Sequence, residues 1–184
     1  MTVDVSTNDG TALAGVDYTA ITAQTVTIPA GMTQAQVAVT VTDDNIVEGN
    51  ETLLLTISNP QFAGAPQTGV VILTESAAGG VITDNDGASV DIDTVLQLED
   101  AGSMTFTATL SNPVDTQVDV EVSTVDGSAE GGDDFTDIVQ TLTFAPGVTT
   151  QTFTVAVTAI SVIDGDYERV SWRSRITVEV EVWR

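Results

Sequence analysis

The sequence contains no cysteine, no histidine and no lysine. Without cysteine there is no disulfide and no thiolate metal site, and the absence of histidine as well disfavours zinc and copper. With no histidine, no cysteine and no other nucleophile beside an evident base, the sequence excludes most catalytic triads. Aromatic residues make up only 5% of the chain, whereas an acid-dependent glycoside hydrolase, the remaining enzymatic alternative, needs a sugar cleft lined with aromatics. The sequence therefore predicts a protein that is not an enzyme.

Basic residues are almost absent too. Four arginines stand against 27 acidic residues, for a formal net charge of −23. Such a surface repels nucleic acid and anionic lipid, and no apolar run approaches the roughly 18 residues that span a bilayer. We therefore expect no nucleic-acid partner and no membrane insertion. Hard cations are the natural partners of so many carboxylates, although acidity that only keeps the protein soluble is the alternative reading.

What the sequence has in abundance is alternation of apolar and polar residues. Val37, Val39 and Val41 alternate with polar neighbours, and several later segments do the same. Those segments are Leu53–Ile57, Met104–Leu110, Val118–Val122 and Phe153–Val157. A period of two buries one face of a strand, and turn formers such as Asp9-Gly10 and Pro146-Gly147 separate the runs. The pattern predicts an all-β sandwich of short strands.

The chain repeats itself. Residues 3–12 (VDVSTNDGTA) recur as residues 120–129 (VEVSTVDGSA), an offset of 117 residues that suits one immunoglobulin-sized repeat. We place the junction near Asp84-Asn85-Asp86-Gly87 and expect repeats at 1–86 and 87–184. The second copy has two further strands before its motif, at about 89–93 and 104–110, which the first copy lacks.

The missing strands would leave an uncovered edge and an exposed core face in the first repeat, and such edges pair with other chains. Because the second repeat is poorly matched beyond Thr158, we expect exchange of strands to fill both deficits, either between two copies as a strand-exchanged homodimer or within one chain as a rearranged sandwich. All four arginines (Arg169, Arg173, Arg175, Arg184) and both tryptophans (Trp172, Trp183) lie in the last sixteen residues. This abrupt change favours a truncation scar or frameshift over a basic patch, although Ile176–Val182 alternates well enough to form a strand.

Three blocks of the first repeat carry a family signature. They are Asp9–Thr19 (DGTALAGVDYT), Asp43–Pro60 (beginning DDNIVEGNET) and Ile82–Asp86 (ITDND). In order and spacing they resemble the Calx-beta family, and the second repeat matches its first part through Asp126–Ala129 and Gly132–Thr136. The resemblance implies a seven-stranded immunoglobulin-like sandwich that binds calcium through carboxylates converging at one end.

The resemblance also implies a ligand set for Ca²⁺. In the first repeat the matching residues are Asp17, Asp43, Asp44, Glu48, Glu51, Asp84 and Asp86. In the second they are Glu99, Asp134 and Asp164, with Asp166 nearby, but Ala159-Ile160 replace the paired aspartates, so a complete second site is not expected. Independently of the family, four acids within nine residues repel one another strongly unless a cation or solvent separates them, and calcium takes six to eight oxygens.

Two roles fit these features. The first is a calcium-binding structural or adhesion module in a repetitive extracellular or bacterial cell-surface protein, with neighbouring repeats as partners. The second is a calcium-sensing regulatory domain. The start of the chain has neither the basic nor the apolar part of a signal peptide, so we expect it to be a piece of a longer protein.

Overall fold

The computed structural model describes residues 1–62, 65–66, 76–158 and 179–181. The chain divides into two compact units, one formed by residues 1–44 and 49–85 and the other by residues 45–48 and 86–184. Within the described residues the regular elements are strands, apart from one short 3₁₀ turn, η1 (Glu99–Ala101). The same residues include no helix long and apolar enough to cross a membrane.

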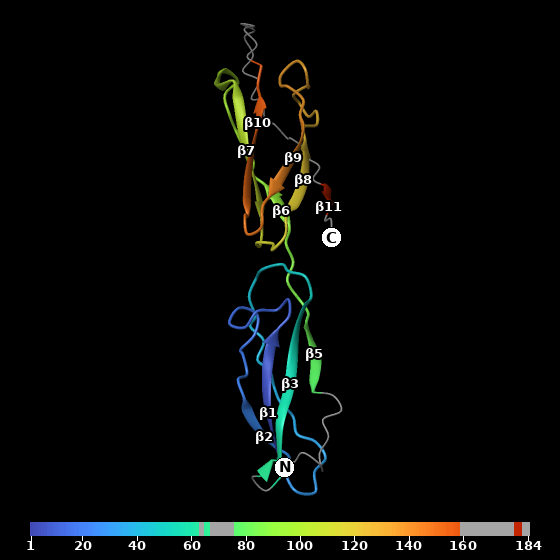
Figure 1. Ribbon diagram of the computed structural model, residues 1–184. Helices are drawn as coiled ribbons and strands as arrows, with labels where there is room; N and C mark the ends of the chain where they lie inside the picture. The colour runs from blue at the N-terminus through green and yellow to red at the C-terminus, as the bar shows by residue number, and fades with distance from the viewer. Residues whose placement is uncertain (63–64, 67–75, 159–178, 182–184) are drawn as a thin grey trace. The chain divides into compact units, whose positions relative to one another are not determined.

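The first unit is built on one antiparallel sheet. Its strands are β1 (Thr2–Asp9), β2 (Gln24–Thr27), β3 (Glu51–Phe62), β4 (Ala65–Pro66) and β5 (Ala77–Ile82). The order is β2-β1-β3-β4, and β5 also pairs with β3 (Figure 1). Alternation places Val3 and Val5 of β1 on the buried face, as the period of two predicts.

The second unit contains two three-stranded sheets. One has the order β10-β7-β6 and the other β11-β8-β9 (Figure 1). The strands are β6 (Val90–Ile92), β7 (Ser103–Leu110), β8 (Val118–Ser123), β9 (Val139–Phe144), β10 (Thr150–Ala156) and β11 (Glu179–Glu181). Buried side chains of β7 and β10 share one core with those of β8 and β9. This is the predicted sandwich, with apolar inner faces packed on each other.

The pairing of β7 with β10 shows why the alternation matters. The register places Phe153 opposite Phe106, and their rings stack with centroids 5.3 Å apart. Aromatic pairs in this offset arrangement add to the stabilisation from burial. Phe106 together with Met104, Ala108 and Leu110 makes β7 a principal wall of the second core, and Phe153 of β10 packs beside it.

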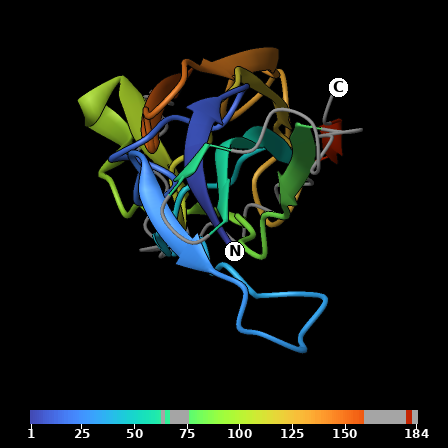
Figure 2. The same cartoon turned by 60° about the horizontal axis from the view of Figure 1, so that its bottom comes forward.

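Among the described residues of 1–86, the strands are β1 to β5, and none of them occupies the position of β6 or β7 of the second repeat. The expectation of a strand at Val37–Val41 is wrong, however: residues 34–40 correspond to β10 but form no strand, and Figure 2 shows a loop after β2. In the second unit β10 pairs along its length with β7. Without that partner the corresponding backbone groups of the first repeat have no ladder to join.

The C-terminal alternation does produce a strand. β11 pairs antiparallel with β8, with Val180 opposite Val120. The four arginines and the two tryptophans lie outside the described residues.

Candidate metal site

A tight loop after β1 fixes the position of Asp17. The backbone N–H of Leu13 donates to Asp17 Oδ2 at 2.6 Å, and the N–H of Asp17 donates to the carbonyl of Leu13 at 2.9 Å. Gly15 turns the chain with φ +88°, a left-handed conformation that favours glycine. As a result Asp17 is a carboxylate only 8% exposed, held at one oxygen by its own loop.

Backbone hydrogen bonds bring a second loop to the first. The N–H of Thr42 donates to the carbonyl of Asp17 at 2.8 Å, and the N–H of Thr19 donates to that of Thr40, also at 2.8 Å. The chain then passes through the acidic segment 43–51 and enters β3 at Glu51. Main-chain hydrogen bonds thus bring the acidic segment close to Asp17.

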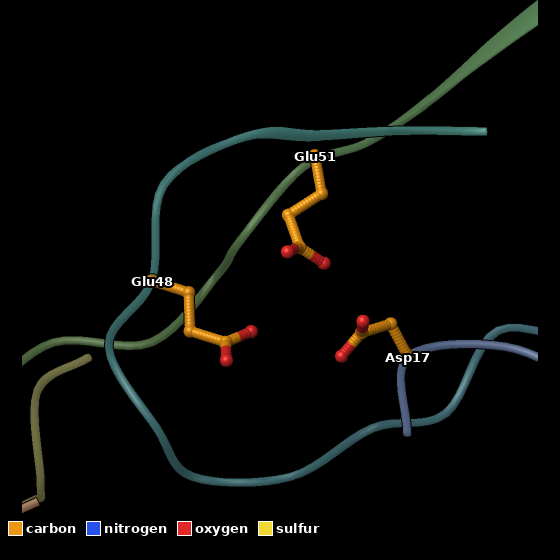
Figure 3. A group of neighbouring side chains, drawn as sticks. All are labelled: Asp17, Glu48 and Glu51. Atoms are coloured by element: carbon orange, nitrogen blue, oxygen red, sulfur yellow. The ribbon is translucent and has the colours of Figure 1, made fainter. Parts of the chain in front are cut away.

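Three carboxylates meet where these loops converge. Asp17, Glu48 and Glu51 each offer an oxygen within 4.8 Å of the other two, and Figure 3 shows their carboxyl groups pointing toward one another. Asp17 is buried and the two glutamates are half-buried. Residues 2–168 contain no lysine, arginine or histidine, so none of them supplies a cationic side chain to this cluster.

The spacing of the cluster suits a large divalent cation. Calcium binds oxygen at about 2.3–2.6 Å, so two of its ligands lie up to roughly 5 Å apart. Three carboxylates at this spacing can surround one such ion and supply most of its charge compensation. Magnesium requires shorter bonds of about 2.0–2.1 Å in near-ideal octahedral geometry, and three side chains of this kind suit it less well.

The remaining acids predicted for the first site lie outside this group of three. Asp43 and Asp44 are exposed and follow the hydrogen-bonded Thr42. Asp84 is half-buried and follows β5, whose Ile82 pairs with Glu51, so the register places Asp84 near the same end of the sheet as Glu51. Asp86 is also half-buried.

The second repeat copies the loop but only part of the ligand set. Asp134 Oδ2 accepts the N–H of Glu130 at 2.8 Å, and the N–H of Thr158 donates to the carbonyl of Asp134, as Thr42 does to Asp17. Glu99 is the first residue of η1. Asp164 and Asp166 lie outside the described residues. Among the described residues, only the first repeat brings three metal-ligand side chains together in this way.

Sequence reasoning missed the hydrogen bond between Tyr18 and Asp9 in the loop that carries Asp17. Tyr18 is 1% exposed and its hydroxyl donates to Asp9 Oδ1 at 2.5 Å. This hydrogen bond to a carboxylate, reinforced by burial, raises the pKa of the tyrosine. The signal was available, because the aspartate of the Asp9-Gly10 turn and the tyrosine beside Asp17 both lie within the block Asp9–Thr19.

Comparison with known proteins agrees with the internal repeat. The Calx-beta domain profile matches residues 1–86 and again residues 82–171. Human sodium/calcium exchanger 3 is 31% identical over 187 residues, covering 92% of this chain, and dog sodium/calcium exchanger 1 is 29% identical over 185 residues, covering 91%. The chain spans 20% and 18% of those two proteins, respectively.

Solved structures give weaker likenesses. The crystal structure of CBD12 from CALX1.2 has a TM-score of 0.41 and 22% identity, covering 88% of this chain and 63% of its own. The apo-form Calx CBD1 domain has a TM-score of 0.34 and 32% identity, covering 36% of this chain and 58% of its own. The two profile matches together cover most of the sequence, and the chain belongs to the Calx-beta domain family, of which it carries two tandem copies.

Proposed function

We propose that this protein is a calcium-binding module and that its first repeat holds the ion. The observation that carries the proposal is the convergence of Asp17, Glu48 and Glu51, whose oxygens lie within 4.8 Å of one another. Like charges at this separation raise the free energy of the empty site, and a bound divalent cation reverses the sign of that interaction. Asp43, Asp44, Asp84 and Asp86 are the further ligands proposed from the family resemblance.

The comparisons support calcium as the ion. The related exchangers carry calcium in their names. The ligand chemistry supports it independently, because an all-oxygen site without histidine or cysteine suits a hard cation. In the second repeat we propose that Glu99, Asp134 and Asp164 form at most a weak site.

Calorimetric titration of calcium into the chelator-treated chain tests the proposal. The wild type should bind with a saturable heat, and Glu48→Gln should lower the affinity at least tenfold because it removes a charged ligand while keeping the side chain's shape. Glu121→Gln is the matched control, since Glu121 is exposed on β8 outside the cluster. Loss of affinity in Glu48→Gln alone supports the site. No saturable heat in the wild type, or equal losses in both variants, would refute it.

Two roles follow from a bound ion. The structural role, in which calcium stiffens repeats 1–86 and 87–184 within a longer chain, is supported by the tandem arrangement. The regulatory role is supported by the likeness to the exchangers. A calcium-dependent change in hydrodynamic radius, measured on the chain and on a longer fragment of its parent, favours sensing. Calcium-dependent stability with an unchanged radius favours the structural role.

Placement in a bacterial cell-surface or extracellular protein stays a prediction. Its support is the high acidity and the repeats, whereas the similar proteins are exchangers. Immunolocalisation of the parent protein on intact and permeabilised cells tests it. The proposed role is also non-enzymatic, and turnover abolished by one carboxylate substitution with folding intact would contradict that.

Strand exchange between two copies is likewise a proposal. Its support is the loop at 34–40, whose counterpart β10 is fully paired with β7. In this structure β7 lies in the sheet of its own repeat, so exchange requires a second copy to release that strand. Light scattering at two concentrations should give a mass near twice 19.1 kDa if exchange occurs, and 19.1 kDa if it does not.

A further inference from the structure

Asp9 stands at the end of β1 and binds two points of the loop that follows. Its Oδ1 accepts the hydroxyl of Tyr18 at 2.5 Å and the backbone N–H of Ala14 at 3.0 Å. One carboxylate oxygen thus connects the first strand to both the middle and the end of the loop. The loop's closing hydrogen bond, from the N–H of Gly15 to the carbonyl of Tyr18 at 2.8 Å, lies between these two points.

These bonds determine where Asp17 points. Asp17 directly precedes Tyr18, and its own Oδ2 is held by the N–H of Leu13 at 2.6 Å. With the ring of Tyr18 1% exposed, rotation of this part of the loop would break the buried hydroxyl's bond to Asp9. The Asp17 carboxyl is therefore fixed in the direction of Glu48 and Glu51 (Figure 3).

The second repeat shows that the loop folds without the hydroxyl. Asp126 Oδ1 accepts the N–H of Gly131 at 2.8 Å, and the N–H of Gly132 donates to the carbonyl of Phe135 at 2.8 Å, as in the first repeat. Phe135 occupies the position of Tyr18 and is equally buried, at 4%. The extra bond of Tyr18 is thus not needed to form the loop. It occurs in the repeat whose three carboxylates converge.

A rigid loop matters most where charges repel. Before the ion binds, the clustered carboxylates repel one another. If the loop lets them move apart, bringing them together again on binding lowers the affinity for the ion. We propose that Asp9 and Tyr18 are positioning residues of the cation site, which hold the Asp17 carboxylate in its binding direction without touching the ion. This inference rests on the proposed calcium function.

The test compares variants by calcium calorimetry, with chelator melts to confirm folding. Tyr18→Phe should weaken binding about fivefold, the effect of one lost hydrogen bond of ordinary strength, and Asp9→Ala should weaken it more. Asp9→Asn should stay within about twofold of wild type, because the amide oxygen still accepts both bonds. If Asp9 were a ligand, loss of its charge in Asp9→Asn would lower the affinity well beyond twofold, as expected for Glu48→Gln.

Thr25→Val is the matched control. It removes a hydrogen bond of 2.8 Å from the Thr25 hydroxyl to the carboxylate of Asp4, which lies on β1 like Asp9 but away from the loop. It should leave calcium affinity unchanged. The positioning role is overturned if wild type binds and Tyr18→Phe binds equally well, or if Asp9→Asn fails as badly as Asp9→Ala. Should Asp9→Ala not fold, the comparison of Tyr18→Phe with Thr25→Val decides. A wild type that binds no calcium overturns the proposed function itself, a distinct outcome.

Discussion

At Gly10 the structure leaves no room for a side chain. A Cβ built there would lie 2.4 Å from the carbonyl oxygen of Thr52 and 2.7 Å from its hydroxyl. That carbonyl accepts the N–H of Ala12 at 3.0 Å, so it cannot move without loss of a bond between the loop and β3. The loop that carries Asp17 therefore lies directly against the central strand.

We expect Gly10→Ala to destabilise the first repeat by about 1–3 kcal/mol, the usual cost of overpacking. Gly79→Ala is the control, because a Cβ on Gly79 in β5 meets nothing within 4 Å. Urea denaturation in chelator, followed by circular dichroism, measures both. Equal stability of the two variants would contradict the close approach.

Tyr18 predicts a dependence on alkaline pH. Its hydrogen bond to Asp9 raises its pKa in the folded state above the ordinary value of about 10. A group with a raised folded pKa contributes its stability fully below the unfolded pKa and loses it as pH rises through the folded one. We therefore expect stability to fall above about pH 10 and to fall less in Tyr18→Phe. Denaturation midpoints measured from pH 8 to 11 in both proteins check this, and parallel curves would contradict it.

At the residue scale, the sequence predicted which acids are candidate ligands but not which of them lie close together. The seven acids of the first repeat were all candidates, and the structure brings together Asp17, Glu48 and Glu51. Convergence depends on main-chain bonds between distant segments, such as Thr42 to Asp17, which local patterns do not encode. Tyr18 was missed because its role depends on a hydroxyl contact, whereas periodicity records only that it is apolar enough to bury.

The element scale shows the limit of alternation as a signal. Val37–Val41 alternates as well as Phe153–Val157 does, yet only the latter segment enters a strand, β10. A strand needs a hydrogen-bonded neighbour as well as an apolar face, and β7 supplies it only in the second repeat. The other predicted segments each lie in or overlap a strand, because each has a hydrogen-bonded partner, which for β3 and β10 comes from a segment about 40 residues or more away in sequence.

Matched substitutions should expose this difference. Val155 of β10 is only 4% exposed, and Val155→Ala should lower the stability of the second repeat by about 1.5–3 kcal/mol. Val37 lies half-buried in the corresponding segment of the first repeat, and Val37→Ala should lower the stability of that repeat by less than about 1 kcal/mol. Thermal denaturation of both variants is the measurement. Comparable losses would mean that residues 34–40 pack as a strand in solution.

For the whole molecule, the two repeats differ in core size. Among the described residues the second core cluster has thirteen buried members and the first has three, Ala12, Tyr18 and Leu53. Because hydrophobic burial dominates stability, we expect two melting transitions, with the first repeat unfolding at the lower temperature.

Calcium should raise that lower transition and leave the upper one nearly unchanged. At a free concentration a hundredfold above the dissociation constant, binding to the folded state alone adds about 2.7 kcal/mol. Magnesium at the same concentration should do much less, because it requires tighter octahedral geometry. Scanning calorimetry with chelator, calcium and magnesium tests both statements. Equal effects of the two ions would indicate general screening of the −23 charge instead.

The loop after β1 has a consequence for how such proteins diverge. It is held by hydrogen bonds from backbone N–H groups to aspartate side chains, and these recur 117 residues later. The bond from Ala14 to Asp9 becomes that from Gly131 to Asp126, and the bond from Leu13 to Asp17 becomes that from Glu130 to Asp134. The downstream acids are not part of this scaffold, since Ala159-Ile160 replace Asp43-Asp44 in a copy whose loop is intact. After duplication, one copy is therefore free to lose its ion by point mutation and still fold.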